Sequence, residues 1–431
     1  MRVLVVGQGA REHALCWKLK QSPLVHELYA APGNAGIASV ADCVQIGVAD
    51  IVELADFAEK LKMDLTVVGP ELPLTLGIVD EFQKRGLAIF GPTRLAAELE
   101  GSKVFSKDFM RKYDIPTAAA WTCNSVDEAK AALKQTKYPA VLKVDGLAAG
   151  KGVVIVESAR EADEYLHMVF EEKKFGTAAT RILVEEFLAG EEVSFIVVTD
   201  GKKALPLAPV KDYKKAFDGD TGPNTGGMGA HSPAVVLGAS TAADIMSSVI
   251  LPTLQGMEAE GRPYTGVLYA GLMLTANGPR VLEYNCRFGD PETQVQMLRL
   301  DDDLAEVCLR VARGNLGDLK ALNFRKEAAA CVVIAVDGYP DDFPKGQEVE
   351  FDPIADDSVV VFHAGVVKRG GKLVNQAGRV VSVCARAASL SEALAKVYEA
   401  APKVRFEGAR YRRDIGYRAL EARKSGAWAV D

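Results

Sequence analysis

Short apolar runs that end at glycine dominate the first third of the chain. These almost wholly apolar runs are separated by segments with helical spacing, and they cover residues 3–6, 65–68 and 88–90. Strands that alternate with helices in this way predict parallel strands with crossover helices in an open, doubly wound sheet. Ligands bind such sheets outside the carboxyl ends of the strands. The candidate substrate contacts are therefore the turns at residues 7–12, 32–36 and 69–73.

The pattern changes near residue 113. Asp114-Ile115-Pro116-Thr117 indicates a linker, because proline disfavours helix at the residue before it. The next segment predicts strands and one helix around a glycine-rich loop, with the strands at 140–144, 153–156 and 181–184 and the helix at 162–170. A long polar loop follows, with further helix and strand signals behind it, at 211–228, 242–260, 267–274 and 280–284.

From residue 328 onward, alternating strand patterns precede a helix near 391–400, which predicts a separate α+β unit. The fold class is thus a multidomain α/β and α+β protein. It has a doubly wound N-terminal domain, a flap domain, a central domain and a small α+β C-terminal domain. The predicted boundaries of these domains are 1–113, 114–190, 191–327 and 328–431.

Composition narrows the class of protein. With 431 residues, 48% hydrophobic and 25% charged, the chain suits several folded cores rather than disorder. Its 51 basic and 58 acidic residues give a net charge of −7, which argues against a general nucleic-acid binder. No apolar run has the length of a transmembrane helix. Seven scattered cysteines without a C-x-x-C pair favour a reducing compartment, so we expect a cytoplasmic protein without membrane or nucleic-acid partners.

The first glycine turn matches a dinucleotide-binding fingerprint only in part. Gly7 and Gly9 follow the first strand, but Glu12 stands where the third glycine would permit close helix–strand packing. A NAD-binding oxidoreductase is therefore a disfavoured alternative. The turn still suits a phosphate at a helix N-terminus, with Arg11 beside it. His13 fits a packed helix position better than a ligand.

The strongest chemical signal begins at Lys143, which lies in the apolar strand 140–144. Burying a lysine there is costly unless its ammonium group meets an anion. The loop at 145–152 adds three glycines and Lys151, so its backbone is free to wrap phosphate oxygens. This loop joins two strands and lacks the Walker A spacing. A lysine that snorkels at a strand end and a plain hairpin loop are the alternatives.

Acidic residues follow the strand predicted at 181–184. Glu185, Glu186 and Glu192 stand beside an extended segment. The backbone of such a segment offers hydrogen bonds to an adenine edge, and a carboxylate accepts them from ribose hydroxyls. A solvated acidic strand end is the alternative interpretation.

A second polar set closes the strand predicted at 280–284. Alternation places Glu283, Asn285 and Arg287 on one face. A carboxylate and an amide oxygen two residues apart are hard ligands suited to Mg²⁺ or Mn²⁺ that bridges nucleotide phosphates. Arg287 would hold a carboxylate or a developing acyl phosphate. A salt-bridged surface strand is the alternative.

Taken in this order, these motifs resemble the ATP-grasp superfamily and, within it, the glycinamide ribonucleotide synthetases. The resemblance runs nearly from end to end and is most specific in the long loops. The motifs that carry it are at 9–14, 31–36, 68–74, 90–93, 100–103, 143–152, 220–229, 283–294 and 413–419.

The resemblance implies a reaction in purine biosynthesis. ATP, glycine and 5-phosphoribosylamine would give ADP, phosphate and glycinamide ribonucleotide, through a carboxylate activated as glycyl phosphate. It also implies that the flap and central domains form the ATP-grasp unit, with ATP and Mg²⁺ or Mn²⁺ as cofactors. The protein would be a monomer or a weak homo-oligomer.

The resemblance also assigns residues. It implies that ATP is held by Lys103, Lys143, Gly150, Lys151, Gly152, Glu185, Glu186, Leu188 and Glu192. Metal ligands would be Glu283 and Asn285. The other substrates would be contacted by Gly9, Arg11, Glu12, Pro223, Asn224, Thr225, Gly226, Gly227 and Met228. The catalytic residues would be Lys143, Asp212 and Arg287.

One departure from the superfamily concerns the metal. Many ATP-grasp enzymes carry a further metal-binding acid on the preceding strand, and residues 267–273 contain none. Two metals held wholly by the protein are therefore not expected. Two alternatives remain besides the oxidoreductase: a formate-dependent glycinamide ribonucleotide transformylase, and a nucleotide-binding module without catalysis.

Overall fold

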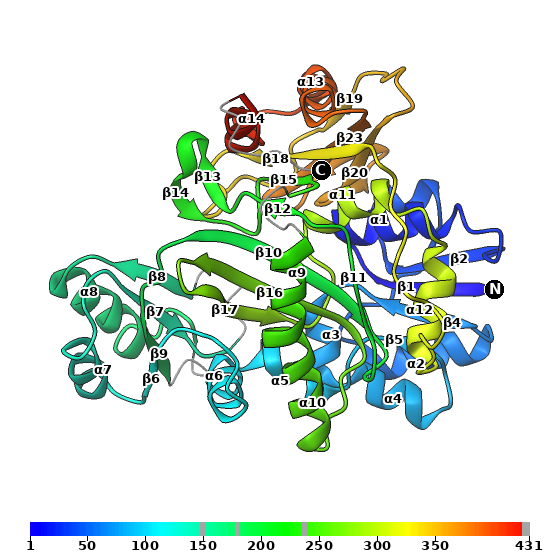
Figure 1. Cartoon of the computed structure of the whole chain (residues 1–431). Coiled ribbons are helices and arrows are strands. Elements are labelled where there is room, and N and C mark those ends of the chain that lie inside the picture. The colour runs from blue at the N-terminus through cyan, green and yellow to red at the C-terminus, as the bar shows by residue number, and fades with distance from the viewer. Residues whose placement is uncertain (147–151, 177–180, 235–238, 425–431) are drawn as a thin grey trace.

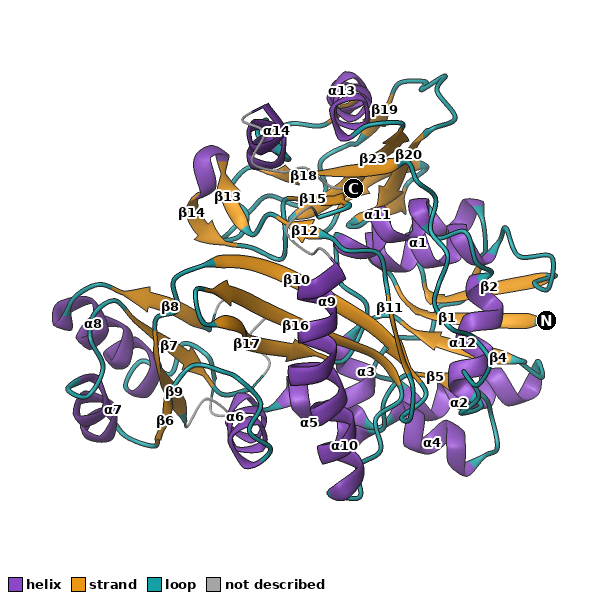
Figure 2. Ribbon diagram, in the orientation of Figure 1, coloured by secondary structure: helices purple, strands orange, loops and turns teal. Residues whose placement is uncertain are grey.

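The structure is a computed structural model that describes residues 1–146, 152–176, 181–234 and 239–424. Within these ranges, we find no helix with the length and apolar character needed to span a membrane. The described residues form four sheets of four to six strands and three two-stranded sheets, with the helices packed around them (Figures 1 and 2).

The N-terminal sheet is doubly wound, as predicted. Its strand order is β3-β2-β1-β4-β5, and the paired strands are parallel. Alternate residues of β1 belong to different cores, since Val3 and Val5 pack in one cluster and Leu4 and Val6 in another. Both sheet faces are therefore buried, which explains the continuous apolar runs. The elements are β1 (Arg2–Gly7), α1 (Ala10–Leu19), β2 (Glu27–Pro32), β3 (Asp42–Cys43), α2 (Ile51–Lys60), β4 (Leu65–Val68), α3 (Glu71–Leu76), α4 (Ile78–Lys84) and β5 (Ile89–Phe90).

A small antiparallel sheet, β6-β9-β7-β8, lies at the left of Figure 1 with helices α7 and α8 beside it. It has its own core, centred on Leu142, Val184 and Leu166. Two helices lead into it from the N-terminal sheet, each with a serine or threonine cap. The elements are α5 (Arg94–Gly101), α6 (Lys103–Lys112), β6 (Ala120–Cys123), α7 (Val126–Leu133), β7 (Ala140–Val144), β8 (Val153–Val156), α8 (Ala159–Phe170) and β9 (Ile182–Glu186).

The central sheet, β11-β10-β16-β17, is antiparallel and runs across the middle of Figure 1. The segment predicted as a long polar loop contains short strands instead, because its polar residues pair with one another and with β15. The elements are β10 (Glu191–Thr199), β11 (Ala204–Pro206), β12 (Lys211–Asp212), β13 (Lys215–Phe217), β14 (Thr221–Asn224), β15 (Gly229–Ser232), α9 (Ala239–Ile245), α10 (Leu251–Ala259), β16 (Gly266–Thr275) and β17 (Gly278–Asn285).

The third sheet joins distant parts of the chain in the order β12-β15-β18-β23-β20. Helix α11 is buried along its whole length and contacts α1, β15 and β18, so it connects this sheet to the N-terminal domain. The domain boundaries drawn from the sequence stay predictions. The elements are α11 (Glu292–Arg299), α12 (Leu304–Ala312), β18 (Ala328–Val336), β19 (Glu350–Phe351), β20 (Val359–His363), β21 (Val366–Arg369), β22 (Lys372–Asn375), β23 (Arg379–Ala387), α13 (Leu390–Ala400), β24 (Val404–Arg405), β25 (Ala409–Arg410) and α14 (Tyr417–Lys424).

Candidate active site

A cavity of about 490 Å³ lies where the small sheet, the central sheet and the C-terminal helix meet. Its apolar lining includes Ile155, Phe187 and Met273, and its charged lining includes Glu192 and Lys214. Glu192 forms an ion pair with Lys214. A pocket lined by both apolar and charged side chains fits a flat ring joined to a polar, anionic group.

Lys143 and Lys107 converge on the carboxylate of Glu185. Lys143 Nζ lies 3.0 Å from Glu185 Oε2 and Lys107 Nζ lies 3.3 Å from the same oxygen. All three residues are buried, and Lys143 also donates to the carbonyl of Leu282 at 2.9 Å. Burial lowers the pKa of Lys107 to about 8 against the opposing effect of Glu185. The structure thus places the predicted nucleotide residue Glu185 beneath two lysines rather than on the cavity wall.

The other predicted nucleotide residues are divided. Glu186 Oε1 accepts from the backbone N–H of Ala119 at 2.9 Å, and the half-buried Leu188 follows the cavity residue Phe187. Gly152 directly precedes β8, and its carbonyl accepts from the Tyr165 hydroxyl at 3.0 Å. Gly150 and Lys151 lie outside the described residues.

Lys103 begins helix α6 and points toward the loop that follows β7. Its Nζ donates to the Gly146 carbonyl at 3.0 Å. Burial lowers the pKa of Lys103, Glu283 opposes this shift, and Lys143 adds to it. Lys103, Lys143 and Glu283 therefore act on one another electrostatically, although they lie on three different elements.

Glu283 and Asn285, which the sequence predicts to be metal ligands, lie near the end of β17. Glu283 faces Gly271 across the strand pair, and its side chain is 39% exposed. Burial raises the pKa of Glu283, but Lys214, Lys143, Lys103 and Arg287 together hold it below its usual value. In the described ranges, no cluster of three or more histidine, cysteine or acidic residues forms a complete metal site. An ionised, partly exposed carboxylate with one amide neighbour nevertheless fits a Mg²⁺ ion whose remaining ligands are phosphate oxygens and water.

Arg287 is held between two carboxylates of the N-terminal part of the chain. Its Nε lies 3.2 Å from Glu71 Oε2, and its Nη2 lies 3.1 Å from Glu100 Oε1. Both acids raise the pKa of the guanidinium against the effect of burial. Sequence reasoning noticed the motifs that contain Glu71 and Glu100 but not their pairing with Arg287, because such pairs depend on the tertiary fold.

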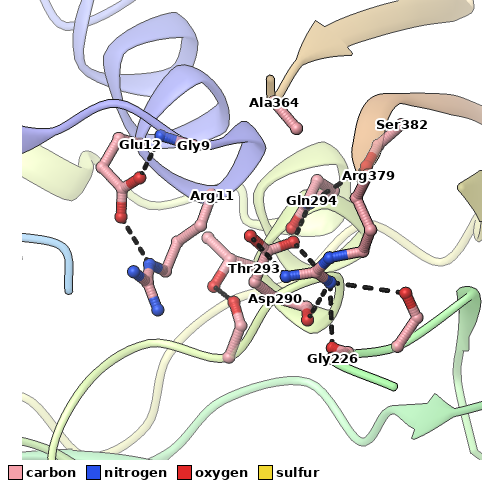
Figure 3. Close-up of polar contacts among 12 residues, drawn as sticks. Gly9, Arg11, Glu12, Gly226, Asp290, Thr293, Gln294, Ala364, Arg379 and Ser382 are labelled. Carbon is pink, nitrogen blue, oxygen red and sulfur yellow. Dashed lines mark hydrogen bonds and ion pairs between the residues drawn. The ribbon is translucent and has the colours of Figure 1, made fainter. Parts of the chain in front are cut away.

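The first glycine turn folds back on itself (Figure 3). Glu12 accepts from the Gly9 backbone N–H and from Arg11 Nε, both at 2.5 Å, so the glutamate caps helix α1. Arg11 Nη1 donates to the Phe288 carbonyl at 3.1 Å. The side chains of Glu12 and Arg11 are thus occupied inside the protein, while Gly9 lies near Asp290: a Cβ at Gly9 would be 3.6 Å from Asp290 Oδ2.

His13, on the same helix, packs against the C-terminal sheet. Its Nδ1 accepts from the backbone N–H of His363 at 2.9 Å. Burial lowers the pKa of His13 to about 3, with a further lowering from the His363 side chain. This neutral, packed histidine matches the interpretation favoured from the sequence.

The predicted substrate run from Pro223 to Met228 splits into three parts. Asn224 lines the cavity beside the exposed Pro223, whereas Met228 is fully buried. Thr225 donates its hydroxyl to the Lys214 carbonyl at 2.8 Å. Gly226 and Gly227, which lie between Thr225 and Met228, make different contacts.

Arg379, at the start of β23, binds these glycines to the 289–292 turn (Figure 3). Its Nη1 donates to the carbonyls of Gly226 and Asp290, both at 2.9 Å, and to that of Gly227 at 3.3 Å. Arg379 Nη2 lies 3.5 Å from Asp290 Oδ2. Sequence reasoning missed Arg379 because it lies almost ninety positions from Asp290; a lone arginine before an apolar strand gives no local signal.

A buried polar network lies behind Asp212. Ser194 Oγ is 3.3 Å from Asp212 Oδ1 and 2.7 Å from the Tyr269 oxygen, and Tyr269 donates to Glu292 Oε1 at 2.7 Å. Burial raises the pKa of both carboxyls; that of Glu292 rises to about 7, with Asp212 as the second cause. Asp212 itself lines the cavity.

Comparison with known proteins covers nearly the whole chain. The family descriptions that match are "Phosphoribosylglycinamide synthetase, N domain" at residues 1–100, "ATP-grasp (A) domain" at 101–293 and "C domain" at 329–418. The chain is 47% identical over 430 residues to the phosphoribosylamine–glycine ligase of Pasteurella multocida, covering 99% of this chain and 100% of that protein. It is 48% identical over 425 residues to the ligase of the same name from Haemophilus influenzae, covering 98% and 99%.

Solved structures agree. The crystal structure of phosphoribosylamine–glycine ligase from Thermotoga maritima aligns with a TM-score of 0.84 at 36% identity, covering 96% of this chain and 100% of that one. Biotin carboxylase from Campylobacter jejuni aligns with a TM-score of 0.74 at 14% identity, covering 99% and 97%. The second likeness concerns the fold alone.

Proposed function

This chain belongs to the phosphoribosylglycinamide synthetase family, and we propose that it is the ATP-dependent ligase that joins glycine to 5-phosphoribosylamine. The products are glycinamide ribonucleotide, ADP and phosphate, in purine biosynthesis. The observation that carries this assignment is near-half identity over the full length of proteins with that name. Three family domains in the expected order, which together span most of the chain, support it as well.

The first half of the proposed reaction activates glycine. A carboxylate is a poor electrophile, and transfer of the γ-phosphoryl group gives it a good leaving group as glycyl phosphate. Such transfer depends mainly on positioning and charge neutralisation. Lys103 and Lys143 supply positive charge beside Glu283, and the burial of Lys143 and half-burial of Lys103 support a role at the phosphates.

Glu283 and Asn285 would hold the metal. A bound Mg²⁺ or Mn²⁺ neutralises phosphate charge, and the lysines that keep Glu283 ionised also keep it ready to bind a cation. Glu192, Phe187 and Ile155 would contact the nucleoside, since they line one cavity that combines apolar and charged side chains.

The second half of the proposed reaction joins the activated glycine to the amine. Arg287 would hold the acyl group, because its fork is fixed by Glu71 and Glu100 while its side chain stays 19% exposed. The loop with Gly226 and Gly227 would contact 5-phosphoribosylamine. We further propose a cytoplasmic location, which the seven free cysteines support.

Phosphate release from MgATP is the test. Glycine and freshly made 5-phosphoribosylamine are added separately and together, and the product is identified by mass. We expect release that requires both, with glycinamide ribonucleotide formed. Release with a different carboxylate and amine would overturn the substrates but not the ligase chemistry. Formate with glycinamide ribonucleotide tests the transformylase, NADH fluorescence tests the oxidoreductase, and ATP binding without release would indicate a non-catalytic module.

A further inference from the structure

Asp212, Ser194, Tyr269 and Glu292 form a continuous chain of oxygen atoms from the cavity into the protein. The four side chains come from β12, β10, β16 and the first position of α11, and each is at most 7% exposed. The contacts between neighbours are 3.3, 2.7 and 2.7 Å in that order, and Ser194 Oγ also lies 3.4 Å from Glu292 Oε1. Asp212 is the member that lines the cavity.

This series of four side chains has fewer hydroxyl hydrogens than contacts between oxygen atoms. Tyr269 uses its hydrogen toward Glu292, so Ser194 has one hydrogen to share among the Tyr269 oxygen, Asp212 and Glu292. Two buried carboxyls linked only by hydroxyls are unfavourable when both are ionised. A proton gained by either carboxyl relieves this repulsion, and rotation of the two hydroxyls is enough to redistribute it.

The ligation itself must release such a proton. The amine nitrogen uses its lone pair to form the C–N bond, the C–O bond to phosphate breaks, and its electron pair leaves with the phosphate. The nitrogen then still carries one proton more than the amide does. A carboxylate at the cavity wall whose affinity for protons is raised by burial suits this proton.

We infer that Glu292, Tyr269 and Ser194 are positioning residues that hold Asp212 ready to accept the proton lost by the amine of 5-phosphoribosylamine. This inference rests on the proposed function, because it assigns a role within the amine-transfer step. Glu292 and Asp212 are both ionised before the step, and they share the released proton after it.

A matched pair of tyrosine variants tests the inference. Tyr269→Phe removes a hydroxyl from the hydrogen-bonded series that begins at Asp212. Tyr284→Phe removes an equally buried hydroxyl on the neighbouring strand, where it contacts Thr253 at 2.6 Å. We expect Tyr269→Phe to lower kcat about 10- to 100-fold while KM for ATP changes less than about twofold. Tyr284→Phe should leave kcat within about twofold.

A pH profile separates proton transfer from simple support. Charged or titratable groups on the elements packed around Glu292 act on its carboxyl group. They are Asp212, Lys214, Tyr269, Arg287 and Arg379. We expect the kcat of the wild-type protein to rise with pH through an inflection near the Glu292 pKa of about 7. Glu292→Gln, which cannot take up this proton, should lose that inflection and at least about tenfold in kcat.

The outcomes are distinct. Equal kcat values for Tyr269→Phe and Tyr284→Phe, or an unchanged profile in Glu292→Gln, would overturn the inference. If Glu292→Gln does not fold, Ser194→Ala replaces it, with the same expected loss of kcat. Wild-type protein that forms no glycinamide ribonucleotide at all would instead overturn the proposed function, so the two failures cannot be confused.

Discussion

Two glutamates buried to the same degree are held in opposite ways. Glu185, 2% exposed, faces the ammonium groups of Lys143 and Lys107, whereas Glu292, 3% exposed, faces two hydroxyls and a second carboxyl. The first arrangement neutralises charge with charge. The second shares protons, and burial raises the pKa of Glu292 to about 7. The comparison teaches that partners, rather than depth, decide what a buried acid contributes.

The largest effect is expected from a substitution of one of the lysines that surround Glu185. Lys143→Ala should lower kcat by about 10³-fold, because a positive charge beside the transferred phosphoryl group is lost. The fold should survive, since Lys107 still pairs with Glu185 at 3.3 Å. Phosphate release measures the turnover, and thermal melting measures whether the fold survives. Lys130→Ala, an exposed lysine that pairs with Asp163, is the control, and near-normal turnover in Lys143→Ala would refute the assignment.

A smaller effect is expected when each of the two glutamates is replaced in turn by glutamine. Glu185→Gln leaves two buried lysines without an anion and should lower the free energy of unfolding by about 3 kcal/mol. At pH 5, Glu292→Gln replaces a protonated carboxyl and keeps an acceptor for Tyr269, so its change should stay within about 1 kcal/mol. Urea unfolding near pH 5 measures both variants. Equal losses at the two positions would remove the distinction drawn here.

The smallest expected effect is a dependence of the free energy of unfolding on pH. The pKa of Glu292 lies at about 7 in the folded protein against 4.5 ordinarily. The folded state therefore keeps this proton longer than the unfolded state, and the wild-type protein loses the associated stability as pH rises between these values. Glu292→Gln does not titrate. Its unfolding free energy relative to wild type should rise between about pH 5 and 7, by about 1 kcal/mol per pH unit.

The control for this pH series is Glu399→Gln, at an exposed position of α13. Its unfolding free energy relative to wild type should not change with pH over the same interval. A parallel change in both variants would mean that the dependence does not come from Glu292.

Local patterns determined much of the fold. The runs at 3–6 and 65–68 are parallel strands of a doubly wound sheet, because a sheet buried on both faces needs continuous apolar residues. Residues 140–144 and 153–156 are paired strands as predicted. Lys143 was found for a related reason, since a charge inside an apolar run must have a partner. The long loops identified the family.

The tertiary structure alone decided which partners the functional residues have. Arg287 meets Glu71 and Glu100, Arg379 meets Gly226 and Asp290, and Glu292 meets Tyr269 and Ser194 across the packed sheets. Each of these contacts joins segments far apart in the chain. Periodicity and spacing report only neighbours within one helix or strand, whereas burial, pairing and pKa depend on what the packed domains bring together. The sequence determined which chemistry this protein carries, and the packing of its domains decided how each charge is held.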